Sequence, residues 1–318
     1  SFRMKNKFYP KLFERGYVGN VEVKNRAVRM PMGTELGNPD GSPSWATLKA
    51  YAEAGDGGTG IVFMDNAGVT QFHHVGLSIA SDPYIGPMSL LAKTIKQHGA
   101  VPGLQIVHPG RDAAFVRGDD LISSSRIMWE PWYENGGGVP RELSGFEIID
   151  IHAACGVLLS NFLSPRNNRR NDMYGGSLHN RARFLIEVIR NIKKKAPGVA
   201  LSVRLSGIDF EPEGITIEET VEVAKMCEAA GADAINITWG SHAEVVNAAG
   251  LLSKHGANHV EAAQMIKDAV SIPTMLCGGI YSPEIGEELL ENGVTDFVGI
   301  GKPALADPMW AKKAEEGH

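Results

Sequence analysis

Residues 146–181 read FEIIDIHAACGVLLSNFLSPRNNRRNDMYGGSLHNR, and this stretch decides the fold. It opens with an apolar, β-branched run at 146–151, which has the length expected of a buried strand. His152 follows directly, and a polar segment rich in Asn, Arg and Gly comes next. A strand that carries a histidine to its carboxyl end and then opens into a polar loop is typical of a barrel enzyme. Taken alone, His152 fits a core histidine better than a catalytic one.

Strand and helix patterns alternate outward from this stretch at the spacing of βα units. Strand-like segments occur at 27–32, 61–64, 102–108, 146–151, 200–205, 234–238, 273–279 and 297–302. Amphipathic helices are expected between most of them, as at 183–195. Eight strands alternating with helices predict an α/β TIM (β/α)8 barrel, and one such domain with insertions accommodates the whole chain, 1–318.

One βα unit is irregular. Residues 109–143 follow the third strand without a helical period. A parallel crossover normally carries a helix of roughly a dozen residues. We therefore expect a helix to be missing between Leu143 and Ser144.

Composition limits the possible partners. The net charge of −6 offers nothing to a polyanion, so nucleic acid is not an expected partner. No run of eighteen apolar residues and no signal-peptide core is found, which predicts a soluble protein without a membrane partner. The three cysteines, Cys155, Cys227 and Cys277, are far apart, which fits a reducing compartment. We expect a cytoplasmic homo-oligomer that acts on a small molecule, with no metal site in these residues.

Glycines end the last two predicted strands. Gly278 and Gly279 close the seventh strand, and Gly301 with Lys302 closes the eighth. In TIM barrels the loops after these strands commonly bind phosphate, because glycine lets backbone N–H groups approach the anion. The pattern favours a phosphate site over the alternative that the glycines only form tight turns.

Three polar residues fall late in neighbouring strands: Gln105, His152 and Arg204. Such positions face the mouth of the barrel, where an aromatic heterocycle held by a phosphate tail would lie. An amide can pair with a pyrimidine edge, and a guanidinium can balance negative charge on a ring. For Arg204, a buried ion pair with a carboxylate is an equally good interpretation.

Several motifs together carry a family resemblance. They are KNR at 24–26, LQIVHPGR at 104–111, LLSNFLSP at 158–165, YGGSLHNR at 174–181, and GKPALADP at 301–308. Over residues 8–318 the chain resembles the FMN barrel of the Old Yellow Enzyme family of NADH:flavin oxidoreductases. The resemblance is to the branch fused to an iron–sulfur cluster and a pyridine-nucleotide domain, with 2,4-dienoyl-CoA reductase, trimethylamine dehydrogenase and bile-acid-inducible flavin oxidoreductases.

The resemblance implies FMN as cofactor and NAD(P)H as reductant. It places Pro31, Met32 and Gly33 along the flavin ring, the backbone of Asn66 at the ring edge, Gln105 at the pyrimidine portion, Arg204 at N1 and O2, and Gly278, Gly279, Gly301 and Lys302 at the phosphate. Lys302 stands where the family usually has arginine. A [4Fe–4S] cluster and FAD are implied for a longer parent chain, of which these residues would be the N-terminal part.

The departures from the family fall in the active site. The family commonly carries His-x-x-His or His-x-x-Asn, followed two residues later by a proton-donating tyrosine. Here the positions hold His152, Cys155 and Val157, so one donor is a weak one and the usual proton source is absent. Gly33 likewise replaces a hydroxyl or thiol that often tunes the flavin.

The sequence therefore predicts an FMN-dependent oxidoreductase with His152 and Cys155 as catalytic candidates. It would transfer hydride between flavin N5 and an activated molecule, an α,β-unsaturated carbonyl or thioester. An amine or other C–H dehydrogenase is one alternative. A phosphate-ligand lyase or isomerase without a redox cofactor, and a flavin-binding scaffold without chemistry, are the others.

Overall fold

The computed structural model describes residues 6–69, 76–108, 110, 145–209, 212–239 and 260–318. Its main sheet closes on itself because β3 pairs in parallel with both β4 and β11. The barrel strands are β3 (Ala27–Arg29), β4 (Ile61–Gly68), β6 (Val101–Val107), β7 (Ile148–Ala153), β8 (Ala200–Ser206), β9 (Ala234–Thr238), β10 (Thr274–Cys277) and β11 (Phe297–Ile300). All eight run parallel, so the predicted TIM barrel is confirmed.

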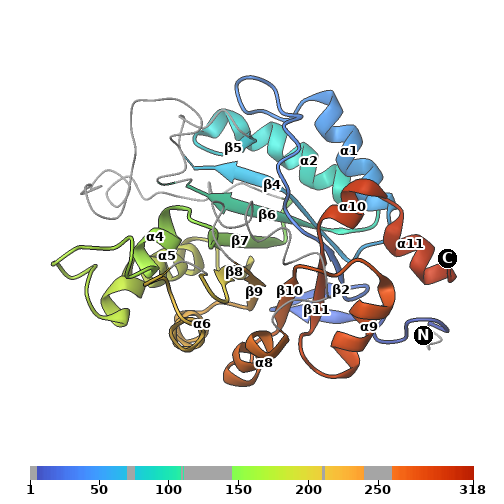
Figure 1. Ribbon diagram of the computed structural model, residues 1–318. Helices are drawn as coiled ribbons and strands as arrows, with labels where there is room; N and C mark the ends of the chain where they lie inside the picture. The colour runs from blue at the N-terminus through green and yellow to red at the C-terminus, as the bar shows by residue number, and fades with distance from the viewer. Residues whose placement is uncertain (1–5, 70–75, 109, 111–144, 210–211, 240–259) are drawn as a thin grey trace.

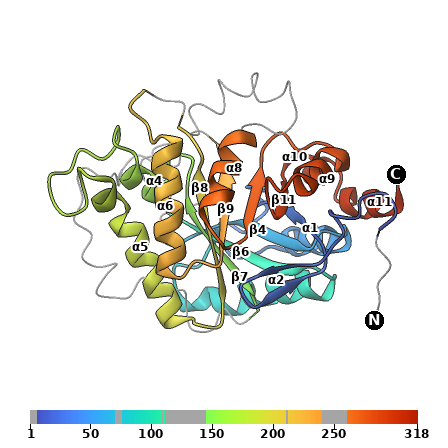
Figure 2. The same cartoon turned by 90° about the horizontal axis from the view of Figure 1, so that it is seen from below.

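Helices form the outer layer of the barrel (Figures 1 and 2). They are α1 (Trp45–Asp56), α2 (Ile85–Gln97), α5 (Leu178–Lys195), α6 (Ile217–Ala230), α8 (Val260–Ala269) and α9 (Pro283–Glu291). Helix α5 shows why they pack there: Leu185, Ile189 and Ile192 recur at helical spacing and are buried against the strands. Ser177 begins this helix by accepting a hydrogen bond from the Asn180 N–H, which satisfies one free donor of the first turn.

A second apolar cluster fills the amino-terminal half of the barrel. The antiparallel hairpin of β1 (Gly16–Val18) and β2 (Val21–Val23) contributes its buried valines to it. They pack with the first inward residues of the barrel strands, among them Ile61, Ile148 and Phe297. Because apolar side chains close this end, polar chemistry is left to the carboxyl ends of the strands.

Several further elements are short, and none of them was expected from periodicity. They are β5 (Leu77–Ser78), the 3₁₀ helix η1 (Asp82–Tyr84), α4 (Leu158–Leu163), α10 (Lys302–Ala306) and α11 (Trp310–Glu316). Each is too short for its helical or strand period to be detected in the sequence. The strand predicted at 146–151 also begins later and runs further, since β7 spans Ile148–Ala153 and therefore includes His152.

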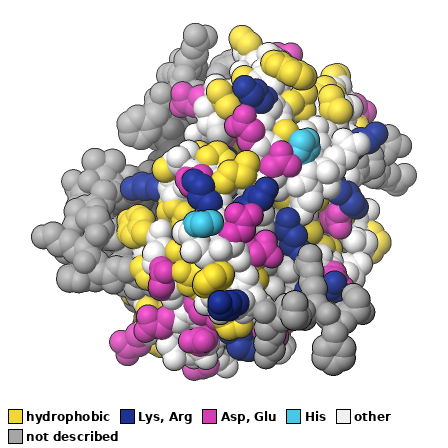
Figure 3. Space-filling view, turned by 90° about the vertical axis from the view of Figure 1, so that its right-hand side faces the viewer, with side chains coloured by type: hydrophobic (Ala, Val, Ile, Leu, Met, Phe, Trp, Pro, Cys, Tyr) yellow, Lys and Arg dark blue, Asp and Glu magenta, His cyan; other side chains and the backbone are white. Residues whose placement is uncertain are grey.

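The two ends of the described chain meet beside α11 (Figure 1). The side-chain amide of Asn6 donates to the Glu315 carbonyl at 2.9 Å. On the face drawn in Figure 3, acidic and basic side chains are interspersed rather than gathered into one basic area. Within the described residues, no helix is long and apolar enough to cross a membrane. The helix expected between Leu143 and Ser144 lies outside the described residues.

Candidate active site at the barrel mouth

Inward-facing polar side chains gather in the carboxyl half of the barrel. The parallel register sets Gln105 opposite Asp150, and sets His152 opposite Arg204, which in turn lies opposite Asn236. Inward positions alternate along a strand, so these residues lie above the apolar layer begun by Ile148 and its neighbours. The structure thus brings Gln105, His152 and Arg204 together on three adjacent strands.

Arg204 places a guanidinium inside the barrel. Its Nη2 donates to the Thr238 hydroxyl at 3.2 Å and approaches the Cys277 sulfur at 3.7 Å. Its Nε is buried and finds no acceptor among the described residues. Burial works to lower the pKa of Arg204, but its interactions with Cys277, Cys155 and Asp150 raise that pKa above the ordinary value. Arg204 is therefore a fixed cation with an unused donor, and no carboxylate hydrogen-bonds to it in the described part of the chain.

His152 is buried at the end of β7, where the Ala154 N–H donates to its Nδ1 at 3.4 Å. An Nδ1 that accepts leaves the proton of a neutral imidazole on Nε2. The ring can therefore donate from Nε2. This is the form in which a histidine polarises an oxygen atom without being charged.

Cys155 occupies a strained turn directly after β7. Its φ is +59°, in the left-handed region that few side chains adopt, and Gly156 follows with φ +89°. The Cys155 N–H donates to the Ser206 hydroxyl at 3.2 Å, which ties the turn to β8. Burial raises the pKa of the Cys155 thiol to about 11. The thiol is therefore neutral at physiological pH and a weak hydrogen-bond donor.

The glycines of the predicted phosphate site follow two paired strands. Gly278 and Gly279 come after β10 with φ of +112° and +73°, and Gly301 comes after β11, which pairs with β10. A side chain at Gly278 would be strained and would also meet Trp239 at 3.1 Å. Lys302 begins α10 and is exposed. The two loops therefore lie side by side, as the sequence predicts.

The loop after β3 is held from outside the barrel. Both the N–H and the hydroxyl of Thr34 donate to Asp65 Oδ2, at 3.0 and 2.6 Å. The Tyr51 hydroxyl donates to Asp65 Oδ1, and the Asp65 N–H donates to the Tyr51 oxygen at 2.7 Å. Pro31 is buried, Met32 is half-buried, and a Cβ at the exposed Gly33 would meet nothing within 4 Å.

Asn66 is half-buried in β4, next to the bulge that shifts the register between Met64 and Ala67. Its carbonyl lies close to Gly76, where an added Cβ would come within 2.9 Å of it. Sequence reasoning missed Asp65, Tyr51 and Asp150. The available signal was a carboxylate inside a largely apolar strand, at 65 and at 150.

The residues present fit FMN. The buried Arg204 Nε has no acceptor within the described chain, and the buried Asn236 Oδ1 receives no hydrogen bond there. Gly33 borders open space, and the left-handed glycines after β10 allow a close backbone approach. A planar, phosphate-bearing heterocycle with a negative edge would use each of these features. The described residues contain no group of His, Cys, Asp and Glu that could hold a metal ion.

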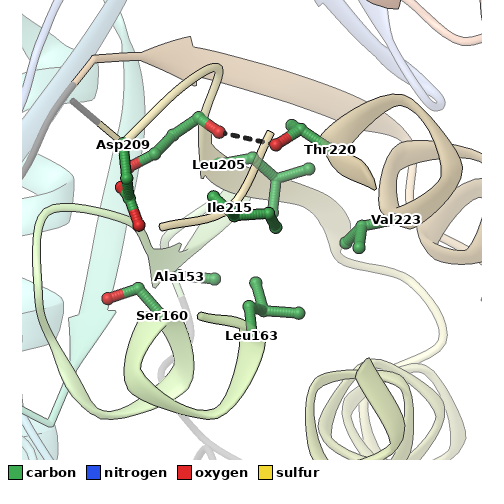
Figure 4. Close-up of a pocket in the computed structure, with 9 residues that line it drawn as sticks. Ala153, Ser160, Leu163, Leu205, Asp209, Ile215, Thr220 and Val223 are labelled. Carbon is green, nitrogen blue, oxygen red and sulfur yellow. Dashed lines mark hydrogen bonds between the residues drawn. The ribbon is translucent and has the colours of Figure 1, made fainter. Parts of the chain in front are cut away.

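A separate small cavity lies behind the site, between α4, α6 and the ends of β7 and β8 (Figure 4). Ala153, Leu163 and Val223 line it, and the Thr220 hydroxyl donates to the Ser206 carbonyl beside it at 3.0 Å. Its volume of about 10 Å³ is near the minimum for one water molecule. It is too small for a substrate.

The barrel and its polar mouth define an α/β-barrel enzyme of the kind that binds a phosphate-bearing cofactor. A family model described as the NADH:flavin oxidoreductase / NADH oxidase family matches residues 133–318. An NADH oxidase of Thermoanaerobacter brockii is 34% identical over 98% of this chain and 51% of its own length. An NADPH dehydrogenase of Geobacillus sp. (strain WCH70) is 32% identical over 94% of this chain and 92% of its own. The chain belongs to this family of flavin-dependent oxidoreductases, and the resemblance expected from its motifs is confirmed.

A solved structure extends the comparison. A 2-naphthoyl-CoA reductase in complex with 2-naphthoyl-CoA superposes with a TM-score of 0.87 at 27% identity, covering 98% of this chain and 53% of that one. The chain thus spans about half the length of the NADH oxidase and of this reductase. The NADPH dehydrogenase matches along most of its length, so the barrel is the part shared by all three.

Proposed function

We propose that this chain is an FMN-dependent oxidoreductase that is reduced by NAD(P)H and reduces a double bond conjugated to a carbonyl or thioester. The buried Arg204 cation with its unused Nε carries the proposal, because a flavin offers Nε an acceptor that no described residue supplies. FMN, when bound, supplies a hydride donor and acceptor at N5.

Each part of the mouth has a role in holding the cofactor. Arg204 would balance charge at N1 and O2, and Gln105 would pair with the pyrimidine edge. The glycines after β10 and β11, with Lys302, would bind the phosphate. Lys302 contributes a point charge where an arginine would add a planar fork. The loop from Pro31 to Gly33, which Asp65 anchors through Thr34, would lie along the ring.

His152 and Cys155 would act on the substrate. His152 would donate from Nε2 to a carbonyl oxygen and stabilise negative charge that develops there. The neutral Cys155 thiol would add a weaker donor. Neither is placed as a proton source in the way of the tyrosine that Val157 replaces, so we assign protonation to solvent. The bound thioester of the 2-naphthoyl-CoA reductase supports a thioester as the activating group.

The test measures flavin content and both half-reactions. The purified protein should show flavin absorbance, bleach anaerobically with NADH or NADPH, and recover colour with an aryl or enoyl thioester. His152→Ala should slow reoxidation by about a hundredfold or more while leaving reduction by NAD(P)H in place. His98→Ala is the control, because His98 lies at the surface beside Asp56 and far from the mouth.

Three results would contradict the proposal. A protein that binds no FMN would favour the lyase or isomerase alternative. Bleaching by an amine in the absence of NAD(P)H would favour an amine dehydrogenase. Equal reoxidation by wild type and His152→Ala would remove His152 from the mechanism. An iron–sulfur cluster and FAD in a longer parent chain, a homo-oligomer and a cytoplasmic location stay predictions.

A further inference from the structure

Asp150 is a buried carboxyl that the proposed chemistry does not use. It lies inside the barrel two residues before His152, with no exposed surface. Burial raises the pKa of Asp150, against the opposing effect of hydrogen bonds from Gln105 and Asn236. A buried carboxyl is unfavourable unless its oxygens are hydrogen-bonded. The burial of the Asp150 carboxyl inside the barrel therefore needs an explanation.

The contacts of Asp150 converge on one oxygen. Gln105 donates from Nε2 to Oδ2 at 2.7 Å, and Asn236 donates from Nδ2 to the same Oδ2 at 3.3 Å. An oxygen that receives two amide N–H groups acts as an acceptor toward both. The orientation of the Gln105 amide is therefore set by Asp150, because an inverted amide would place oxygen against oxygen.

The orientation of the Gln105 amide determines which of its atoms is available to a ligand at the barrel mouth. With Nε2 bound to Asp150, the other end of the amide, Oε1, is left as an acceptor. Oε1 receives no hydrogen bond from any residue that the structure describes, although Gln105 is only 2% exposed. A pyrimidine edge of an isoalloxazine presents one N–H donor, at N3, between two carbonyl acceptors. Only an amide that offers its oxygen matches that central donor.

We propose that Asp150 is a positioning residue, which fixes the Gln105 amide so that its Oε1 accepts from the flavin N3–H. This rests on the proposed function, since it needs FMN at the mouth. It assigns the buried carboxyl a part in selecting the cofactor ring. Asp150 acts through Gln105 and touches neither the substrate nor the flavin.

The test titrates the FMN-free full-length protein with FMN and with its N3-methyl derivative, and reads binding by flavin fluorescence. N3-methylation removes the donor, so wild type should prefer FMN. Asp150→Leu removes the acceptor, frees the Gln105 amide to turn, and should reduce that preference by roughly tenfold, the equivalent of one hydrogen bond. Asp150→Asn keeps an oxygen that can face Gln105 and Asn236, and should retain the preference.

Two further variants distinguish a change in the orientation of the Gln105 amide from a general loss of structure. Thr274→Val is the control, because Thr274 is equally buried but lies at the opposite end of the barrel. Adding Asp150→Leu to Gln105→Leu should cost no further preference, since the amide is already gone. Asp150→Ala replaces the leucine variant if that one does not fold.

The outcomes are distinct. If wild type binds no FMN, the proposed function fails. If wild type binds FMN and Asp150→Leu keeps the full preference, the positioning role is wrong while the function stands. If Asp150→Asn behaves like Asp150→Leu, the charge of Asp150 matters rather than the orientation of Gln105, and the inference is overturned.

Discussion

Tyr51→Phe tests the hydrogen bonds between Tyr51 and Asp65. Asp65 in turn holds the loop after β3 through Thr34. The Tyr51 hydroxyl is fully buried, donates to Asp65 Oδ1 and accepts from the Asp65 N–H at 2.7 Å. Phenylalanine keeps the ring, including its contact with the Arg29 guanidinium 4.8 Å from the centroid. The substitution therefore leaves two buried polar groups without partners, each at a cost of about 1–3 kcal/mol. We expect a loss of about 2–6 kcal/mol in the free energy of unfolding.

The assay is denaturant unfolding of wild type and variant, followed by circular dichroism. Tyr84→Phe is the matched control, because its hydroxyl donates to the Asp40 carbonyl at 2.6 Å on the surface. That change should cost less than about 0.5 kcal/mol. Burial raises the pKa of the Tyr51 phenol, so its stabilisation is lost as pH rises above about 10, the ordinary phenol value. The gap between wild type and Tyr51→Phe should therefore narrow at high pH. Equal losses in Tyr51→Phe and Tyr84→Phe would refute the reasoning.

Three other changes have outcomes that the structure specifies. Arg181→Met breaks the ion pair between the buried Arg181 and the half-buried Glu219 and should lower the free energy of unfolding by about 1.5–3 kcal/mol in the same denaturation assay. Arg204→Met removes the cation that we propose beside the flavin edge and should make the two-electron FMN potential about 30–60 mV more negative by redox titration, the equivalent of about 1.5–3 kcal/mol. Cys155→Ala removes a thiol whose pKa burial raises to about 11, so wild type should lose up to about 2–3 kcal/mol of stability between pH 9 and 11 that the variant keeps. An identical alkaline profile for wild type and Cys155→Ala would contradict the last of these.

The barrel could be predicted because its signals are local. Each strand is a short apolar run, and each long helix has a buried face at helical spacing, as in α5. The closed barrel was then predicted from the number of strand–helix units, which is eight. The same logic placed Gln105, His152 and Arg204 together, since neighbouring parallel strands carry late residues to one end.

The contacts that hold the site residues in place could not be predicted, because they join segments far apart in the chain. Nothing near Asp65 indicates that Tyr51 on α1 will meet it, and the bulge in β4 changes the alternation there. The partners of Asp150 lie on two other strands. A left-handed residue at Cys155 is also unexpected, since cysteine has no special tolerance for that backbone. These features depend on tertiary contacts, which local patterns do not encode.

The two halves of the barrel interior differ in their contribution to stability, and the half that holds the site lowers it. The amino-terminal half is closed by valines of the β1–β2 hairpin, which pack in an apolar cluster with the first inward residues of the strands. The carboxyl half holds Arg204 and Asn236 with buried atoms that no described residue satisfies, and such atoms each cost about 1–3 kcal/mol. The left-handed backbone at Cys155 adds about 1–3 kcal/mol of strain. A core selected for stability alone would replace these groups. Their retention at the end where a ring and its phosphate would bind indicates that a ligand offsets the cost, by satisfying the donors and acceptors that the fold leaves open.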